Sequence, residues 1–369
     1  MSNIISFLHK YGSIPFSQMP FCDVDNLVLS YLAYAELDGI VPSPNENSSV
    51  TVYEATDTYI AGQYDGSNAA PGAEKDRILA LLKGMAFGAR YQDARLSGYV
   101  SEYDAVHKKQ FAALTIELAD GTLFVAFRGT DNNLASWQED FNMSFETTPA
   151  QAESVRYLEN TMQRCGGMFR VGGHSKGGHL SVYACTMCED RLKARLLTVY
   201  SNDGPGLDQD LINSNAYSLI RSKVVHIIPA HGVLGMLFEH DAQVRIVKSS
   251  NEGFNQHDCI SWMVEGMDFV EVKKLEAKAI FLNKVFSGWL DRVPLAQRKV
   301  FVESLFDTFS ECGMETFADV RNAGTMKIAK ILVMMQPRAK EVRQTTTALV
   351  GSFASTIASD TFSLIGQAA

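Results

Sequence analysis

Residues 173–178 read Gly-His-Ser-Lys-Gly-Gly and carry the strongest chemical signal in the chain. They fit Gly-x-Ser-x-Gly, a pattern that presents a serine on a sharp turn between a strand and a helix. The glycines allow the strand and the helix to approach closely, and the helix N-terminus directs N–H groups and partial positive charge toward a developing oxyanion. We interpret Ser175 as a nucleophile; the alternative is an incidental serine in a glycine-rich turn.

A second signal lies upstream, where Phe127-Arg128-Gly129-Thr130 is followed by Ser136-Trp137-Gln138-Glu139-Asp140-Phe141. A strand that ends in Arg-Gly-Thr places backbone N–H groups on a loop at the carboxyl edge of a sheet, where an oxyanion hole needs them. Taken alone, the segment is better interpreted as a hairpin strand with an ordinary polar exit. Its value comes from the serine turn that follows it.

Together the two segments closely resemble the class 3 lipases of the α/β-hydrolase superfamily. The stretch from about Asp25 to Phe269 also resembles a bacterial family of lipase-like α/β-hydrolases of unassigned function. The resemblance implies an oxyanion hole made by the backbone N–H groups of Thr130 and Lys176, with the Thr130 hydroxyl as a further donor. It also implies that the region of Trp137 and Asp140 borders a lid. Further matching segments are 202–206, 233–237, 247–250 and 256–258.

A serine hydroxyl is nearly inert at neutral pH, so Ser175 requires a base. Among the eight histidines, His257 comes last, after the final predicted strand, which fits the chain order Ser, acid, His. His231 and His240 come early, and His174 and His179 flank the serine too closely to turn back onto it. We predict His257 as the base, with a surface or helix-capping histidine as the alternative.

The acid is where the sequence departs from the lipase pattern. Class 3 lipases take their acid after the strand that matches 224–228, but the following loop reads Pro-Ala-His-Gly and has no carboxylate. Asp203, which follows the strand 196–201, is the next choice, with an Asx-turn as its structural alternative. Asp241 and Glu239 are the runners-up.

Two features near the serine have competing readings. Lys176 stands where lipases usually carry an apolar residue: its side chain could attract an anionic substrate or lower the pKa of the serine, or it could equally point to solvent. Cys185 and Cys188 form a Cys-x-x-Cys, but a zinc site would need a second pair. We interpret them as buried packing thiols, and no phosphate loop or His-Glu-x-x-His motif is present, so no cofactor or metal is expected.

Alternating strand and helix patterns surround these residues. Residues 111–118 and 123–127 flank Asp120-Gly121 and predict a β-hairpin. Strands are predicted at 168–173, 196–201, 224–228 and 244–247, and helices at 25–39, 77–89, 149–164 and 176–190, with a loop region over 41–72. Strands separated by helices predict an α/β fold, three layers around a mostly parallel sheet.

From about residue 270 the strand patterns stop. Amphipathic helices with breaks near Pro294 and Gly324 are expected over 270–343, and an uncharged helix docked on the body over 344–359. We therefore expect an α/β-hydrolase-like domain at 1–269 and a helical region at 270–369, through which the chain could self-associate.

Composition excludes several classes of protein. The 369 residues carry 33 basic and 42 acidic side chains, a net charge of −9, which argues against nucleic-acid binding and a polybasic membrane surface. No run approaches the roughly 18 apolar residues of a membrane span, and no signal peptide is visible. Six cysteines are too few for a disulfide scaffold, so we expect a cytoplasmic protein.

These observations predict a serine hydrolase that cleaves a carboxylic ester, with a lipid-like or other acyl ester as substrate. Ser175 would attack, His257 would transfer the proton, Asp203 would orient His257, and an acyl-enzyme would form. The alternative is a hydrolase-fold protein with little or no activity that acts through protein partners.

Overall fold

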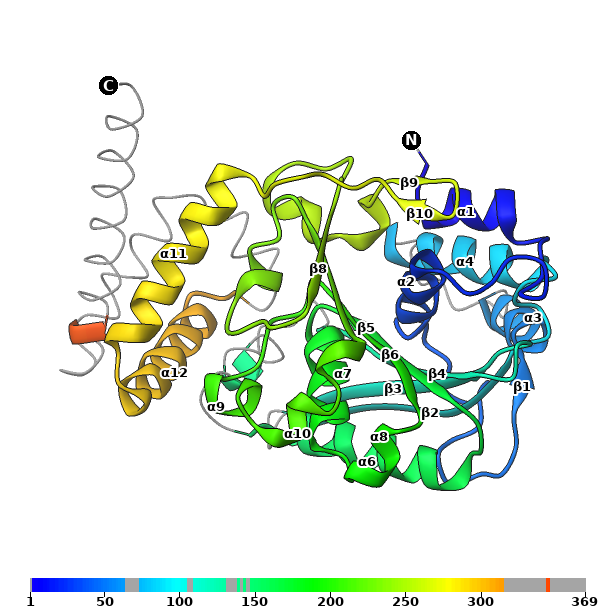
Figure 1. Cartoon of the computed structure of the whole chain (residues 1–369), viewed down its shortest axis with the longest axis horizontal. Helices are drawn as coiled ribbons and strands as arrows, with labels where there is room; N and C mark the ends of the chain where they lie inside the picture. Colours follow the sequence, from blue (N-terminus) through cyan, green and yellow to red (C-terminus); the bar gives the residue numbers. More distant parts are fainter. Residues whose placement is uncertain are drawn as a thin grey trace. The chain divides into compact units, whose positions relative to one another are not determined.

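An eight-stranded sheet organises the chain, and its strands lie side by side in sequence order from β1 to β8 (Figure 1). The computed structural model describes residues 2–63, 73–104, 109–130, 138–139, 142–143, 147–314 and 343–345. The parallel strands are β4 (Leu123–Phe127), β5 (Phe169–His174), β6 (Leu196–Asn202), β7 (Val224–Pro229) and β8 (Gln243–Val247). The antiparallel pairs are β1 (Val50–Thr51) with β2 (Arg95–Asp104), and β3 (Lys109–Glu117) with β4. The mostly parallel α/β sheet expected from the sequence is confirmed.

Side chains of β4 show why the sheet carries helices on both faces. All five of its residues are buried and apolar, as in a strand covered on both sides. Phe124 and Ala126 belong to one hydrophobic core, whereas Leu123, Val125 and Phe127 belong to the other. The two cores are therefore separated by the sheet, because successive side chains point to opposite faces.

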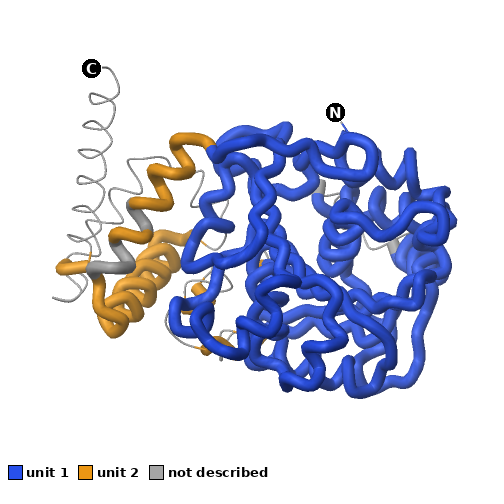
Figure 2. The backbone as a smooth tube through the Cα atoms, in the orientation of Figure 1, with its two compact units in different colours: residues 1–103, 110–129, 150–275 blue, residues 104–109, 130–149, 276–369 orange. Residues whose placement is uncertain are grey.

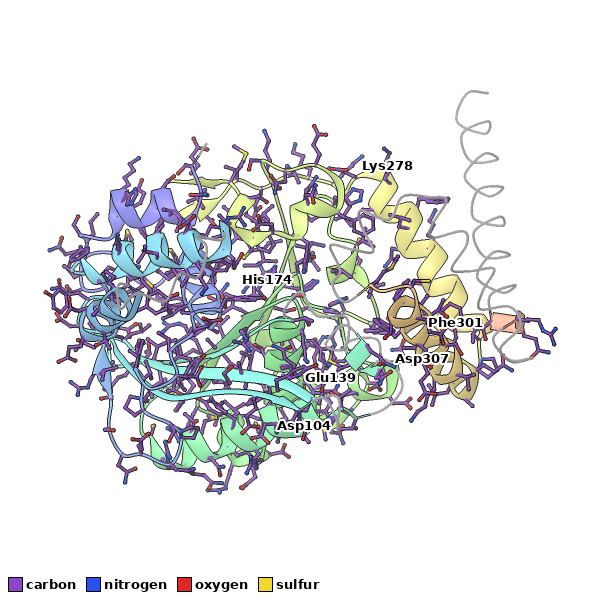
Figure 3. All side chains as sticks on the ribbon, turned by 180° about the vertical axis from the view of Figure 1, so that it is seen from behind. Asp104, Glu139, His174, Lys278, Phe301 and Asp307 are labelled. Carbon is purple, nitrogen blue, oxygen red and sulfur yellow. The ribbon has the colours of Figure 1, made fainter. Side chains whose placement is uncertain are left out.

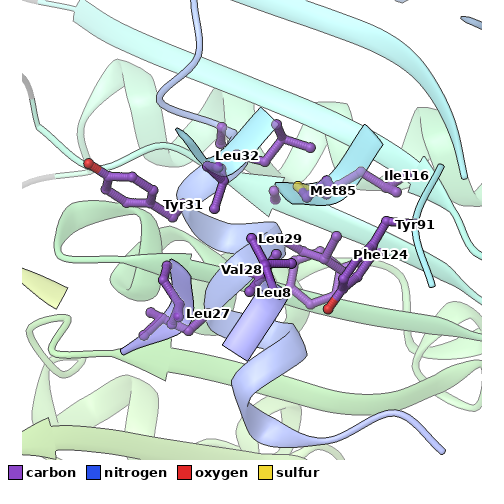
Figure 4. Close-up of a cluster of buried hydrophobic side chains, with 14 of the residues drawn as sticks. Leu8, Leu27, Val28, Leu29, Tyr31, Leu32, Met85, Tyr91, Ile116 and Phe124 are labelled. Atoms are coloured by element: carbon purple, nitrogen blue, oxygen red, sulfur yellow. The ribbon is translucent and has the colours of Figure 1, made fainter. Parts of the chain in front are cut away.

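Different helices fill the two cores. The core of Phe124 is built with α1 (Ile4–Tyr11), α2 (Asp23–Leu32), α3 (Val52–Gln63) and α4 (Ala73–Ala86), as the close-up in Figure 4 shows for α2. The core of Phe127 is built with α6 (Pro149–Arg164), α7 (Lys176–Met187) and the short helices α8 (Asp190–Lys193), α9 (Gln209–Ile212) and α10 (Asn215–Ser218). This arrangement is the three-layer α/β fold.

The loop expected over 41–72 is wrong for residues 52–63, which form α3. The Thr- and Gly-containing composition of the region obscured a helical spacing of Val52, Ala55 and Tyr59, all of which are buried. β2 and the small hairpin of β9 (Val264–Glu265) and β10 (Asp268–Phe269) were not predicted either. β2 is half-exposed and irregular in its burial, so its sequence lacks a clear period of two.

The chain divides into two compact units (Figure 2). The first comprises residues 1–103, 110–129 and 150–275, and the second comprises residues 104–109, 130–149 and 276–369. The second unit contains α11 (Ala277–Arg292) and α12 (Leu295–Glu311), which confirms additional helices in the C-terminal part. The division at residue 270 stays a prediction, and the helix expected over 344–359 lies almost wholly outside the described residues. Within the described ranges, no helix is both long and apolar enough to cross a membrane.

A buried ion pair between Arg90 and Asp25 of α2 also binds the segment between α1 and α2. The Arg90 guanidinium donates to both carboxylate oxygens of Asp25, and neither side chain is exposed. The remaining guanidinium hydrogens reach the carbonyl oxygens of Ile14, Met19 and Pro20. Because every donor has an acceptor, the desolvated pair is tolerated, whereas an unpaired charge at this place would not be.

We expect Asp25→Ala to lower the free energy of unfolding by about 3–5 kcal/mol, because it leaves the Arg90 charge buried and uncompensated. Asp57→Ala, at an exposed position of α3, is the control and should change that free energy by less than about 0.5 kcal/mol. Urea unfolding followed by circular dichroism measures both. Equal effects of the two variants would contradict the structural role given to the pair.

Candidate active site

The turn between β5 and α7 presents Ser175 on a strained backbone. Ser175 has φ 57° and ψ −128°, in the left-handed half of conformational space, and its N–H donates to the Asn202 carbonyl at 2.9 Å. At Gly177, an added Cβ would overlap the Phe127 carbonyl oxygen at the end of β4. The glycine is therefore required by close approach of α7 to β4, as in a nucleophile elbow.

Three side chains predicted from the sequence meet at this turn. Ser175 Oγ lies 3.0 Å from His257 Nε2, and His257 Nδ1 lies 2.6 Å from Asp203 Oδ2. Ser175 and Asp203 are almost fully buried, and the His257 side chain is 23% exposed. Such a chain can raise the nucleophilicity of a hydroxyl, because the imidazole accepts its proton and the carboxylate stabilises the imidazolium.

The loop after β7 shapes the surroundings of Asp203. Asp203 also has a positive φ, 51°, and its N–H donates to the Ile227 carbonyl of β7 at 2.7 Å. The Gly235 N–H donates to Asp203 Oδ1 at 3.1 Å, so each carboxylate oxygen has a donor. A Cβ on Gly235 would overlap the same oxygen. The loop after β7 has no carboxylate at the position where lipases carry the acid. It instead binds the carboxylate of Asp203, which follows β6.

The other two carboxylates considered from the sequence lie elsewhere. Asp241 accepts a hydrogen bond from the Arg221 guanidinium at 2.7 Å. Glu239 is exposed, and its backbone pairs with Leu207. In the part of the chain that the structure describes, Asp203 is the carboxylate that hydrogen bonds the His257 ring.

The two residues expected in the oxyanion hole belong to different segments of the chain. Lys176 is the first residue of α7, where backbone N–H groups have no intrahelical acceptor. Thr130 is half-buried and belongs to the second unit, whereas Gly129 before it belongs to the first. A Cβ added to Gly129 would lie 3.2 Å from Ser175 Cβ, so the segment that leads to Thr130 passes against the serine. Trp137 and Asp140 lie outside the described residues.

The Lys176 side chain does not point to solvent, and that interpretation is wrong. It is 1% exposed, and its Nζ donates to the Gln110 carbonyl of β3 at 2.9 Å. A buried ammonium needs such an acceptor. At this position it is not offered at the surface to an anionic substrate.

Several histidines near the elbow are held neutral. Burial, followed by the charge of His257, lowers the pKa of His174 to about 3. Burial lowers the pKa of His179 to about 4, and it also lowers the pKa of His226. Their ring nitrogens hydrogen bond the His257 carbonyl, the Gly206 carbonyl and the Gly235 carbonyl, respectively. Each ring thus ties its own element to a nearby loop: His174 to the turn of His257, His179 of α7 to the segment after Asp203, and His226 of β7 to the loop that follows it.

Sequence reasoning missed some residues that hold the site. Tyr34 of the segment after α2 contacts His174, and Arg77 of α4 pairs with Asp258 at 2.9 Å beside His257. Neither residue has a local motif, because each is brought to the site by the packing of a helix. Figure 3 labels His174 among the side chains around the sheet.

Cys185 and Cys188 are buried and not joined by a disulfide, as expected for packing thiols. In the described ranges, no group of His, Cys, Asp and Glu side chains could hold a metal ion.

A mostly parallel sheet with helices on both faces, and an elbow serine after β5, defines the class: the α/β-hydrolase fold of the lipase-like kind. Residues 85–307, more than half of the chain, match the family described as Mbeg1-like, and the chain belongs to that family. The resemblance expected from the sequence is thus confirmed as a lipase-like α/β-hydrolase relationship.

A solved structure, "Crystal structure of M37 lipase", is similar at 15% sequence identity with a TM-score of 0.36. The match covers 57% of this chain and 68% of the lipase chain. No curated protein matches the chain.

The buried neutral histidines make folding stability depend on pH. Their pKa values are lowered by folding from an ordinary value of about 6.5, so the unfolded chain binds protons first as the pH falls. Stability conferred this way is complete above pH 6.5 and is lost on acidification toward pH 4, where His179 titrates. His179 should contribute a slope of up to about 1.4 kcal/mol per pH unit.

We expect His179→Asn to reduce the dependence of the unfolding free energy on pH between 6.5 and 4, as measured by urea titrations at several pH values. His9→Asn, at an exposed position of α1, is the control and should keep the wild-type slope. A wild-type slope in His179→Asn would show that this ring is not neutral in the folded protein.

Proposed function

We propose that the protein is a serine hydrolase that cleaves a carboxylic ester, with Ser175 as nucleophile. The observation that carries the proposal is the unbroken hydrogen-bond chain from Ser175 Oγ through the His257 ring to Asp203, at 3.0 and 2.6 Å. A lipase-like fold supports the same class of reaction. An acyl ester of the kind found in lipids is the substrate class that fits the family resemblance.

The reaction follows from this geometry. His257 Nε2 takes the Ser175 proton as the serine oxygen attacks the ester carbonyl, and Asp203 stabilises the imidazolium through Nδ1–H. The imidazolium then protonates the leaving alcohol, which departs to give an acyl-serine. Water, deprotonated by His257 in turn, hydrolyses the acyl-enzyme and restores the serine.

The oxyanion of each tetrahedral intermediate would accept hydrogen bonds from backbone N–H groups. Lys176 N–H at the start of α7 and Thr130 N–H are the proposed donors. The dipole of α7 adds partial positive charge at the same point. The proposal needs no metal or cofactor.

The alternative of an inactive scaffold has two supports, the missing acid after β7 and the C-terminal helical region outside the resemblance. The first support weakens because Asp203, at the end of the neighbouring strand, hydrogen bonds His257. Self-association through the C-terminal helices, action through protein partners and a cytoplasmic location stay predictions.

We expect Ser175→Ala to lower the turnover of short p-nitrophenyl esters by about 10⁶-fold, to background, because the nucleophile is absent. Thr186→Ala is the control on the same helix: it also removes a buried hydroxyl, which donates to Val182. It should keep wild-type turnover in the folded protein. Equal turnover by wild type and Ser175→Ala would refute the proposal.

The identity of the acid is tested separately. Asp203→Asn should lower kcat by about 10⁴-fold with little change in KM, because the amide cannot stabilise the imidazolium. Asp241→Asn breaks only the ion pair with Arg221 and should leave kcat near the wild-type value. The opposite ranking of the two variants would assign the acid to the loop before β8.

A further inference from the structure

His257 lies in a short 3-10 turn, Gly253–His257, and not on a strand or long helix. A base must keep its Nε2 within hydrogen-bond distance of the nucleophile, and a displacement of 1 Å can cost about 100-fold in rate. The backbone of this turn therefore needs fixed contacts. One of them comes from the residue directly before the serine.

His174 reaches the backbone of His257. Its Nε2 lies 2.8 Å from the His257 carbonyl oxygen, and the two rings contact each other in a tilted arrangement, with 4.7 Å between centroids and 35° between planes. Its other nitrogen, Nδ1, lies 3.0 Å from the Tyr34 hydroxyl oxygen. His174 is 7% exposed, so both contacts are shielded from water.

The hydrogen-bond partners of His174 determine which of its two ring nitrogens carries the hydrogen. A carbonyl oxygen can only accept, so His174 Nε2 carries the hydrogen and donates it. His174 Nδ1 in the neutral ring is then a lone pair, and the Tyr34 hydroxyl donates to it. The lowered pKa of His174, about 3, agrees with a ring that stays neutral beside the charge formed on His257 during turnover.

Tyr34 extends the connection to the segment that leads to the oxyanion hole. A Cβ on Gly129 would overlap both the Tyr34 hydroxyl and the His174 carbonyl oxygen, and it would lie 3.2 Å from Ser175 Cβ. The hydroxyl thus lies between the end of β4 and the His174 ring. One hydrogen-bonded pair bridges the serine turn, the Gly129 backbone and the turn that carries the base.

We propose that Tyr34 and His174 are positioning residues, a neutral hydrogen-bonded tether that fixes the backbone of His257 relative to Ser175. The inference rests on the proposed function, because it assigns the tether to the base of that reaction. It requires that His174 act as a donor to a carbonyl and an acceptor from a hydroxyl, and that it never be protonated in the cycle.

The experiment compares two replacements at one position. His174→Gln offers an N–H donor and a carbonyl acceptor at the end of its side chain, so it can replace both contacts, whereas His174→Leu can make neither. With p-nitrophenyl esters, we expect His174→Leu to lose about 100-fold in kcat with little change in KM, and His174→Gln to retain most of the wild-type kcat. Because His174 does not titrate in the cycle, the pH profile of His174→Gln should keep its wild-type shape.

Tyr34→Phe should give a smaller loss of kcat than His174→Leu, since the donor to the carbonyl remains. Tyr157→Phe is the matched control: it removes a buried tyrosine hydroxyl that bonds Thr115 and the Gly98 carbonyl on the other face of the sheet. It should lower stability without changing kcat. Wild-type kcat in His174→Leu, or an equal loss in His174→Gln, would overturn the tether.

Hydrogen exchange separates this inference from the proposed function. In His174→Leu, amides of residues 250–262 should exchange faster than in wild type, and in His174→Gln and Tyr157→Phe they should not. Hydrogen exchange can be measured even if the protein turns over no ester. Absence of turnover would refute the proposed function and leave the tether standing. Unchanged exchange in His174→Leu would refute the tether alone.

Discussion

The left-handed backbone at Ser175 is the constraint on which the site depends. A non-glycine residue in that conformation costs about 1–2 kcal/mol and persists only where its surroundings impose it. Here they do: the glycines beside it let α7, β4 and β5 touch backbone to backbone, and the Ser175 N–H is held by Asn202. In this conformation the Ser175 hydroxyl lies within hydrogen-bond distance of His257. The tight packing of the sheet and α7 therefore fixes the position of this one side chain.

Asp203, at the end of the neighbouring strand β6, is a second residue with a strained backbone. Asp203, directly after Asn202, also has a positive φ, and Asp is among the residues that tolerate it. Asn202 is buried, and its side chain bonds Asn26 of α2 and the Gly173 carbonyl. These hydrogen bonds join the ends of β5 and β6 to each other and to α2. These contacts hold both Ser175 and Asp203, the two residues whose side chains hydrogen bond His257.

Much of this arrangement could be predicted from local sequence. The elbow has a five-residue pattern in a strand–helix context, and the parallel strands are short buried apolar runs. α3 and β2 were missed because the helix is masked by turn-forming residues and the strand lacks alternation. Tyr34, Arg77 and Gly235 could not be assigned, because their contacts join segments far apart in sequence. For Lys176, sequence position left a charge offered to substrate and a solvent-facing side chain equally open, and tertiary burial excludes both.

We propose above that Ser175 is an activated nucleophile. This proposal is tested most directly by incubating the full chain with a fluorophosphonate probe and mapping the modified peptide by mass spectrometry. We expect one covalent adduct, on Ser175, in native protein and none after unfolding in urea, since the serine is reactive only while His257 and Asp203 are in place. Absence of labelling in the native protein, or labelling at another serine, would contradict the proposal.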